Sequence, residues 1–350
     1  DDQIGRARYE LAPDDSFDFF PEWKVKEREW LAEQGAAFVS IVSQSPDLLK
    51  GIDSKRIATF QKAAGTALNK YRQYVQSDKI SWTVIASPSE AWAEKVFPNL
   101  PKEKQVDALW DAIFKATRSD LDNPVEAWTK HNDTLHEKVH YLNAKKYAKL
   151  HYTAPGTDLT IELPKGHLWC GAGSVNEKGE EFMANMPTEE VFTVPHKDGV
   201  NGYVSSTKPL SYGGNIIDNF KITFENGRIT KVEAEQGEEV LKNLVATDEG
   251  SHRLGEVALV PHDSPISNSG LLFYNTLFDE NASNHLAIGS AYAFCLEGGK
   301  KMNREELEAN GLNQSITHVD FMIGSAEMNI DGITEDGKTE PVFRNGNWAF

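Results

Sequence analysis

The hydrophobic periodicity of the chain changes near residue 148, and this change constrains the fold more than any other feature of the sequence. Before it, residues 36–43 and 80–87 are short apolar runs typical of buried strands. Residues 57–75 between them carry apolar side chains at the spacing of one long helix. A strand, a helix and a second strand predict a βαβ unit with parallel strands. The first part of the chain therefore predicts an α/β domain.

Helical patterns surround this unit, and strand patterns follow it. Residues 21–35 predict a helix that ends at a glycine, and residues 102–117 and 124–147 predict two more helices. From residue 148 onward the sequence is typical of strands and hairpins, with a type I′ turn indicated at Asn226-Gly227. Helical interruptions of this second part are expected near residues 237–248, 268–279 and 303–310.

The length of 350 residues leaves room for two domains. We predict an α/β N-terminal domain over residues 1–147 and a β-rich α+β C-terminal domain over residues 148–350. No linker rich in proline or serine separates the two regions, so we expect the domains to share a tight interface.

Composition excludes several classes of partner. The net charge is −17 and no basic block is present, which argues against nucleic acid and against anionic membrane surfaces. No apolar stretch approaches the length of a membrane span. The only two cysteines, Cys170 and Cys295, fit a reducing compartment better than a disulfide scaffold, so we predict a cytoplasmic protein.

His318 and Asp320 lie two residues apart in the segment SITHVDFMIGS, which is typical of a strand. Side chains alternate along a strand, so both would project from the same face. Burying an imidazole and a carboxylate together is costly unless something compensates the polar groups, and a divalent cation is one such compensator. A hydrogen bond between the two side chains in a core is the alternative explanation.

Three other segments place polar, metal-competent side chains among hydrophobic residues. Glu189 and Glu190 open the apolar run of NMPTEEVFTVP, Glu256 lies inside SHRLGEVALVP, and NHLAIGSAYAF carries His285 and Tyr292. Two histidines and three carboxylates suit Zn, Co or Mn better than Mg or Ca. Carboxylates in that number can also bridge two cations. The pattern therefore predicts two-metal hydrolysis.

A competing motif lies on the helix predicted over residues 124–147. His136, Glu137 and His140 match H-E-x-x-H, the spacing that binds zinc in one large class of metallopeptidases. Lys138 stands between the two histidines, where its charge would oppose a zinc ion, and no third histidine follows in the next turns. A single-zinc peptidase using His136 and His140 stays an alternative, and a solvated pair of histidines is the simpler explanation.

The segments NMPTEEVFT, GEVALVP, NHLAIGSAYAF and THVDFMIGS, in this order, resemble the bacterial thermophilic aminopeptidase family, and the resemblance covers nearly the whole chain. The resemblance implies a metalloaminopeptidase that hydrolyses the N-terminal bond of peptides with two divalent metal ions (Zn, Co or Mn) and an activated water. It also implies a homodimer and an α/β domain followed by a β-rich domain. Family members carry a further N-terminal segment, so we expect this chain to lack the first portion of its N-terminal domain.

The same resemblance implies roles for individual residues. Tyr292 falls on the active-site tyrosine of the family and would donate a hydrogen bond to the tetrahedral oxyanion. Glu256 is expected to be both a ligand and a catalytic glutamate, although the identity of the general base stays open. Glu189 is expected to point away from its neighbour, unless the two lie in a bend and exchange roles. The five metal ligands implied are Glu190, Glu256, His285, His318 and Asp320.

A non-catalytic binding protein with a structural metal site is the alternative from a different functional class. Structural sites are closed and hold one metal, whereas ligands spread over four segments leave positions open for substrate. The sequence therefore favours a hydrolase.

Overall fold

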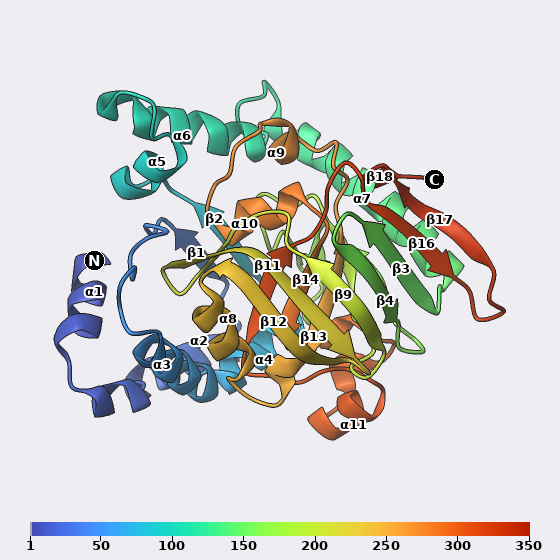
Figure 1. Cartoon of the computed structure of the whole chain (residues 1–350), viewed down its shortest axis with the longest axis horizontal. Helices are drawn as coiled ribbons and strands as arrows, with labels where there is room; N and C mark the ends of the chain where they lie inside the picture. The colour runs from blue at the N-terminus through green and yellow to red at the C-terminus, as the bar shows by residue number, and fades with distance from the viewer. Residues whose placement is uncertain (1) are drawn as a thin grey trace.

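The computed structural model describes residues 2–350 and combines two kinds of architecture (Figure 1). The first part of the chain is mostly helical around a small parallel sheet, and the second part builds two larger antiparallel sheets. Helices α1, α2 and α3 lie on one side of the molecule in Figure 1, and the largest sheet lies on the other. The predicted fold class is confirmed, while a domain boundary between residues 147 and 148 stays a prediction.

The predicted βαβ unit is present. Strands β1 (Phe38–Val42) and β2 (Trp82–Ala86) pair in parallel, with Phe38 opposite Trp82. The connection between them contains two helices, α3 (Ser54–Ala67) and α4 (Asn69–Gln76), where the sequence predicted one. Leu68 leaves the helical conformation and separates the two, a short interruption that the apolar spacing does not reveal.

The expected burial of the first strand is wrong. Val39 and Ile41 of β1 are each 63% exposed, and β1 pairs with β2 alone among the described residues. Apolar β-branched residues favour strand conformation whether or not another layer covers them. The sequence therefore predicted the strand correctly and its surroundings incorrectly.

The helices of the first part follow their sequence signals closely. Helix α2 (Glu22–Glu33) ends just before Gly35, whose φ of +73° is easy for glycine only. Helix α7 (Pro124–Lys145) begins after Asn123, whose side chain accepts a hydrogen bond from the backbone N–H of Glu126. The other helices of this part are α1 (Asp2–Leu11), the 3-10 helix η1 (Asp14–Asp18), α5 (Glu90–Val96) and α6 (Lys102–Ala116).

Nine strands form the largest sheet, in the order β10-β11-β9-β4-β3-β16-β17-β18, with β12 also paired to β11. The predicted turn between β11 and β12 is confirmed, because Asn226 and Gly227 have φ values of +48° and +79°. Its strands are β3 (Lys149–Ala154), β4 (Thr157–Glu162), β9 (Val200–Ser205), β10 (Leu210–Tyr212), β11 (Asn215–Glu225), β12 (Arg228–Gln236), β16 (Asn329–Ile333), β17 (Thr339–Arg344) and β18 (Asn347–Trp348).

A second sheet of five strands gathers the four segments singled out in the sequence. Its order is β15-β14-β13-β8-β5, and every residue of β13 and β14 is buried. One continuous core joins this sheet to the larger sheet and to the apolar side of α7, with Leu135 and Leu142 among its members. The strands are β5 (Cys170–Gly171), β8 (Val191–Thr193), β13 (Leu254–Leu259), β14 (His285–Gly289) and β15 (His318–Met322).

One helix predicted in the second part is mostly wrong. Within 268–279, only the end of α9 (Pro265–Asn268) and the short α10 (Thr276–Asp279) are helical. Tyr274 has a φ of +53°, and the carboxylate of Asp279 accepts hydrogen bonds from the backbone N–H groups of Phe273 and Asn275. These bonds offer the backbone an alternative to the helix.

The remaining elements are short, and two of them match predicted helical interruptions. Within residues 2–350, none of the helices combines the length and apolar character that a membrane crossing requires. The elements are α8 (Glu238–Val245) and α11 (Arg304–Ala309), as predicted, with η2 (Gly250–His252), η3 (Glu280–Ala282), η4 (Ala293–Cys295), η5 (Gly299–Lys301), β6 (Ser174–Val175) and β7 (Glu181–Phe182).

Candidate metal centre

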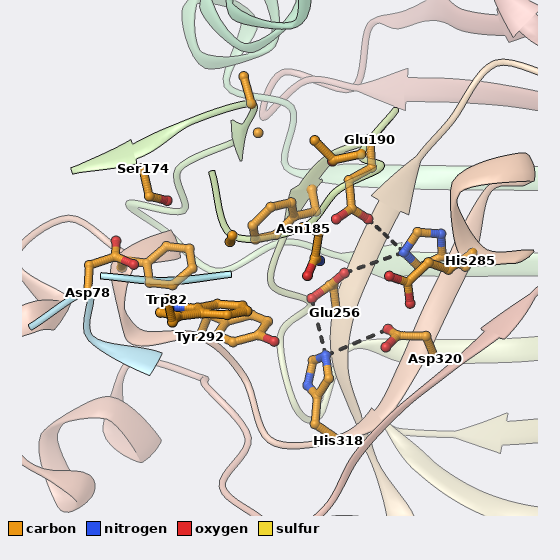
Figure 2. Close-up of a pocket in the computed structure, with 17 residues that line it drawn as sticks. Asp78, Trp82, Ser174, Asn185, Glu190, Glu256, His285, Tyr292, His318 and Asp320 are labelled. Atoms are coloured by element: carbon orange, nitrogen blue, oxygen red, sulfur yellow. Dashed lines mark ion pairs between the residues drawn. The ribbon is translucent and has the colours of Figure 1, made fainter. Parts of the chain in front are cut away.

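The five-stranded sheet brings the five predicted ligands together (Figure 2). Glu256 lies on β13, His285 opens β14, and His318 and Asp320 lie on β15. Glu190 directly precedes β8. Asp320 pairs with Ala287 across β14 and β15, and Glu256 pairs with the same alanine from β13, so the strand register aligns the ligands across three strands.

The distances within this cluster are short. Nε2 of His285 lies 2.8 Å from a carboxylate oxygen of Glu190 and 3.6 Å from one of Glu256. Nε2 of His318 lies 3.4 Å from the other oxygen of Glu256 and 3.6 Å from Oδ1 of Asp320. Glu256 therefore lies between the two imidazoles and contacts both.

The other nitrogen of each imidazole is held by the backbone. Nδ1 of His285 lies 3.0 Å from the carbonyl oxygen of Ser283, and Nδ1 of His318 lies 2.7 Å from that of Ser290. A carbonyl can only accept, so Nδ1 donates in both cases. Nε2 of each imidazole then faces the carboxylates, and in the neutral form it would offer its lone pair to a cation, the orientation that a metal-binding histidine requires.

Carboxylate oxygens in the cluster are buried against the imidazoles. Oε2 of Glu190 and Oδ1 of Asp320 are buried and face imidazole nitrogens, Nε2 of His285 at 2.8 Å and Nε2 of His318 at 3.6 Å, which compensate a carboxylate only when they carry a proton or a cation. Glu190 and Glu256 are both buried. Burying several negatively charged carboxylates together destabilises the folded protein unless positive charge compensates them. The donor set and the buried carboxylate oxygens therefore fit divalent cations.

The pKa values of the cluster are shifted by burial and by the excess of carboxylates over imidazoles. Burial lowers the pKa of His318, but the carboxylates of Asp320 and Glu256 outweigh burial and raise it to about 9. Burial raises the pKa of Glu256, but its hydrogen bonds to His285 and His318 lower it to about 2. Burial raises the pKa of Glu190 and of Asp320. Without a cation, protons on the imidazoles supply the positive charge that compensates the carboxylates.

Glu280 is a sixth member of the cluster that the sequence did not reveal. It lies on η3, is buried, and forms a group of possible ligands with His285 and Asp320, whose ligand atoms lie within 4.8 Å of one another. Burial raises its pKa well above the ordinary value, and the nearby carboxylates of Asp320 and Glu190 add to the shift. The available signal was an acidic residue inside a buried turn just before His285.

Tyr292 lies beside the cluster and lines the same pocket. Its ring lies 4.8 Å from the His318 ring between centroids and stacks on Phe294 at 5.1 Å. Burial raises the pKa of Tyr292 well above its ordinary value, and the carboxylate of Glu256 adds to the shift. The hydroxyl therefore keeps its proton and can donate a hydrogen bond into the pocket.

Glu189 points away from the cluster, but its carboxylate is not in solvent. Its two oxygens lie 2.6 Å and 3.1 Å from the guanidinium nitrogens of Arg118, and one lies 3.4 Å from Nε2 of His131. The same His131 nitrogen lies 2.8 Å from the carbonyl oxygen of Thr188. Glu189 thus belongs to a buried ion pair that joins the start of β8 to the corner between α6 and α7.

The H-E-x-x-H motif of α7 does not assemble a comparable site. Glu137 and His140 are exposed, and Nδ1 of His136 lies 3.2 Å from the side-chain nitrogen of Asn132. The rings of the two histidines lie 6.3 Å apart between centroids. Across residues 2–350, none of the groups of three or more close metal-competent side chains includes this motif. The single-zinc alternative is therefore not supported.

The N-terminal part closes one side of the pocket. Asp78 and Trp82 line the pocket together with the candidate ligands, opposite His285 and Asp320 in Figure 2. Nζ of Lys300 lies 2.9 Å from the carboxylate of Asp78. The cavity has a volume of about 70 Å³. The candidate site is therefore small and enclosed by both parts of the chain.

Comparisons with known proteins identify the family of the chain. The model of the family described as Thermophilic metalloprotease (M29) matches residues 1–348. Aminopeptidase AmpS of Bacillus subtilis (strain 168) is 70% identical to the chain over 350 residues, and Aminopeptidase T of Thermus thermophilus is 44% identical over 349 residues. Both matches cover 100% of this chain and 85% of the relative.

A solved structure supports the fold. The structure described as wild-type AmpT from Thermus thermophilus matches with a TM-score of 0.90 and 43% sequence identity, over 100% of this chain and 85% of that chain. The family resemblance predicted from the four sequence segments is thereby confirmed. The chain is a member of the thermophilic metalloprotease (M29) family.

Proposed function

We propose that this protein is a metal-dependent aminopeptidase that removes the N-terminal residue of peptides with two divalent cations. The observation that carries the proposal is the convergence of two imidazoles and three carboxylates in one buried pocket. The relatives are named aminopeptidases, which supports cleavage at the N-terminal end of the peptide. The proposed ligands are Glu190, Glu256, His285, His318 and Asp320, with Glu280 adjoining them.

Zn, Co or Mn are the proposed cations, because imidazole nitrogen and carboxylate oxygen together suit these borderline metals. Divalent cations bound there would supply Lewis-acid chemistry, which activates water and polarises a peptide carbonyl. Tyr292 is placed to donate its hydroxyl proton in a hydrogen bond to the oxygen on which negative charge develops.

Proton transfer has two candidate carboxylates. Glu256, between the two imidazoles, remains our proposed catalytic glutamate. Glu280 is the second candidate, because its carboxylate lies close to the side chains of His285 and Asp320. Either residue could take a proton from water and return it to the leaving amine.

A homodimer and a cytoplasmic location remain proposals. The homodimer rests on the family resemblance. The cytoplasmic location is supported by the two free cysteines, Cys170 and Cys295, which fit a reducing compartment. A purely structural metal site is less consistent with the pocket, because structural sites are closed by their ligands.

Hydrolysis of matched substrates tests the proposed function. An aminoacyl anilide with a free amine should be hydrolysed, and its N-acetylated counterpart should be resistant, because an aminopeptidase requires the free terminal amine. Exhaustive chelation should abolish the reaction, since metal chemistry is the proposed source of the nucleophile, and added Zn²⁺, Co²⁺ or Mn²⁺ should restore it. Hydrolysis that persists with metal content near zero, or that ignores acetylation, would contradict the proposal.

Metal affinity should increase with pH. The pKa of His318 is raised to about 9 when no cation is bound, so a cation must displace a proton from it below that pH. Affinity should therefore rise by about tenfold per pH unit for each proton displaced, between about pH 7 and pH 9. Competition with a chelator of known pH-dependent affinity measures this directly. A corrected affinity that is constant over this interval would contradict the expectation.

A further inference from the structure

A second cavity adjoins the metal-site pocket, and it is much larger. It has a volume of about 610 Å³ and runs between α7 and the segment from Gly173 to Met186. We call it the α7 groove. Its apolar lining comes from Val125 and Trp128 of α7 and from Val175, Phe182, Met183 and Met186 of the facing segment.

We propose that the α7 groove binds the part of a peptide substrate that follows the scissile bond, and that it favours an apolar side chain there. This proposal rests on the proposed aminopeptidase function. It adds to that function a preference for the sequence and length of the peptide beyond its first residue.

The two cavities adjoin at a shared lining residue, Ser174, and this is the first argument for the proposal. Ser174 lines both the metal-site pocket and the groove, and the preceding residues Gly171 and Ala172 line the pocket while Gly173 lines the groove. In Figure 2, Ser174 lies across the pocket from His285 and Asp320. A peptide whose scissile bond lies beside the cluster can therefore extend past Ser174 into the groove.

The shape of the groove is the second argument. The metal-site cavity of about 70 Å³ has little room beyond the reacting group, whereas about 610 Å³ falls within the range of small-ligand sites. Val125 is 78% exposed and Val175 is 48% exposed at the groove. The groove is thus open to solvent, so a longer peptide can leave the molecule there.

Hydrogen bonds to both walls hold the groove in shape. The side-chain oxygen of Asn132 on α7 accepts a hydrogen bond of 2.8 Å from the backbone N–H of Gly173. The opposite wall is tied to β2, because the N–H of Val84 donates to Ala184 at 2.8 Å and the N–H of Met186 donates to Val84 at 3.1 Å. A preformed groove loses less entropy on binding than a mobile one.

The charges lining the groove indicate which part of a peptide it would bind. Among the described residues lining the groove, Glu181 is the one with a formal charge, and neither lysine nor arginine is present. A free C-terminal carboxylate would find no cation there. The lining therefore favours an apolar segment of a longer peptide over the terminus of a dipeptide. His136 of the H-E-x-x-H motif also lines the groove, where its ring can contact a peptide without any metal.

The test compares two substrates on variants that introduce charge. Two substrates are used: a tetrapeptide amide with phenylalanine at positions two and three, and an aminoacyl anilide, which has no residue beyond the first. The kcat/KM of the tetrapeptide divided by that of the anilide measures how much the groove contributes to substrate recognition. Val125→Glu should lower this ratio by about three- to tenfold, because a carboxylate at the groove must be desolvated by an apolar side chain. With lysine in place of phenylalanine, the same variant should raise the ratio.

Controls separate the possible outcomes. Val125 is exposed, so its variant should fold, and Met183→Glu provides a second position in the groove wall. Leu11→Glu is a matched exposed change on α1, away from the groove, and should leave the ratio unchanged. Opposite shifts for phenylalanine and lysine peptides support the proposal, whereas a ratio unaffected by both groove variants overturns it. Wild-type protein inactive on both substrates would instead refute the aminopeptidase function.

Discussion

His318→Ala should abolish peptide hydrolysis and lower the bound metal, with the fold retained. The imidazole lies 3.4 Å from Glu256 and 3.6 Å from Asp320, so its removal takes away a neutral ligand and leaves two carboxylates facing a cavity. Loss of a residue that merely orients a ligand typically costs 10- to 100-fold in metal affinity or activity, so loss of a ligand should exceed about 100-fold. Glu256→Ala should behave in the same way, because Glu256 contacts both imidazoles.

Metal analysis, steady-state rates and circular dichroism together check this expectation. His151→Ala is a matched control, since His151 lies 2.9 Å from Asp158 in an ion pair on the larger sheet, outside the metal-site pocket. The control should retain metal content and turnover. A His318→Ala protein with normal metal content and normal rates would show that the cluster is not the catalytic centre.

Much of the candidate site was predictable because strands impose a simple rule on side chains. Alternation placed His318 and Asp320 on one face, and the structure has both in the cluster. The acid of Glu256 within an apolar strand was informative for the same reason, since burying a carboxylate requires a compensating partner. Local periodicity thus identified each ligand segment, and the family resemblance joined the segments into one site.

What the sequence did not reveal depends on contacts between distant segments. Glu280 enters the cluster from η3, just beyond the helical stretch that the sequence predicted over 268–279. The partner of Glu189 is Arg118, 71 residues earlier, and no local pattern indicates such a pair. The exposure of Val39 likewise depends on which elements pack against β1, and not on strand propensity.

Glu189→Ala should destabilise the protein strongly, although Glu189 points away from the cluster. Its carboxylate lies 2.6 Å from the guanidinium of Arg118, and both side chains are largely buried. Removing one partner of a buried ion pair leaves the other charge uncompensated, at a cost of about 3–5 kcal/mol in the free energy of unfolding. The backbone N–H of Glu189 still donates its hydrogen bond to Oδ1 of Asn281 in this variant, but that bond cannot replace the lost charge.

Urea-induced unfolding of the metal-loaded protein measures this change, and a double-mutant cycle isolates the pair. Arg118→Ala should be similarly destabilising, and the double variant should cost less than both single variants combined, because it leaves neither charge buried alone. Lys26→Ala breaks the exposed pair of Lys26 and Glu22, which lie 2.7 Å apart, and should change stability by under about 1 kcal/mol. Additive effects at Arg118 and Glu189 would mean that the two charges are compensated independently. Strong coupling would instead show that this ion pair joins α6 and α7 to the segment that carries Glu190.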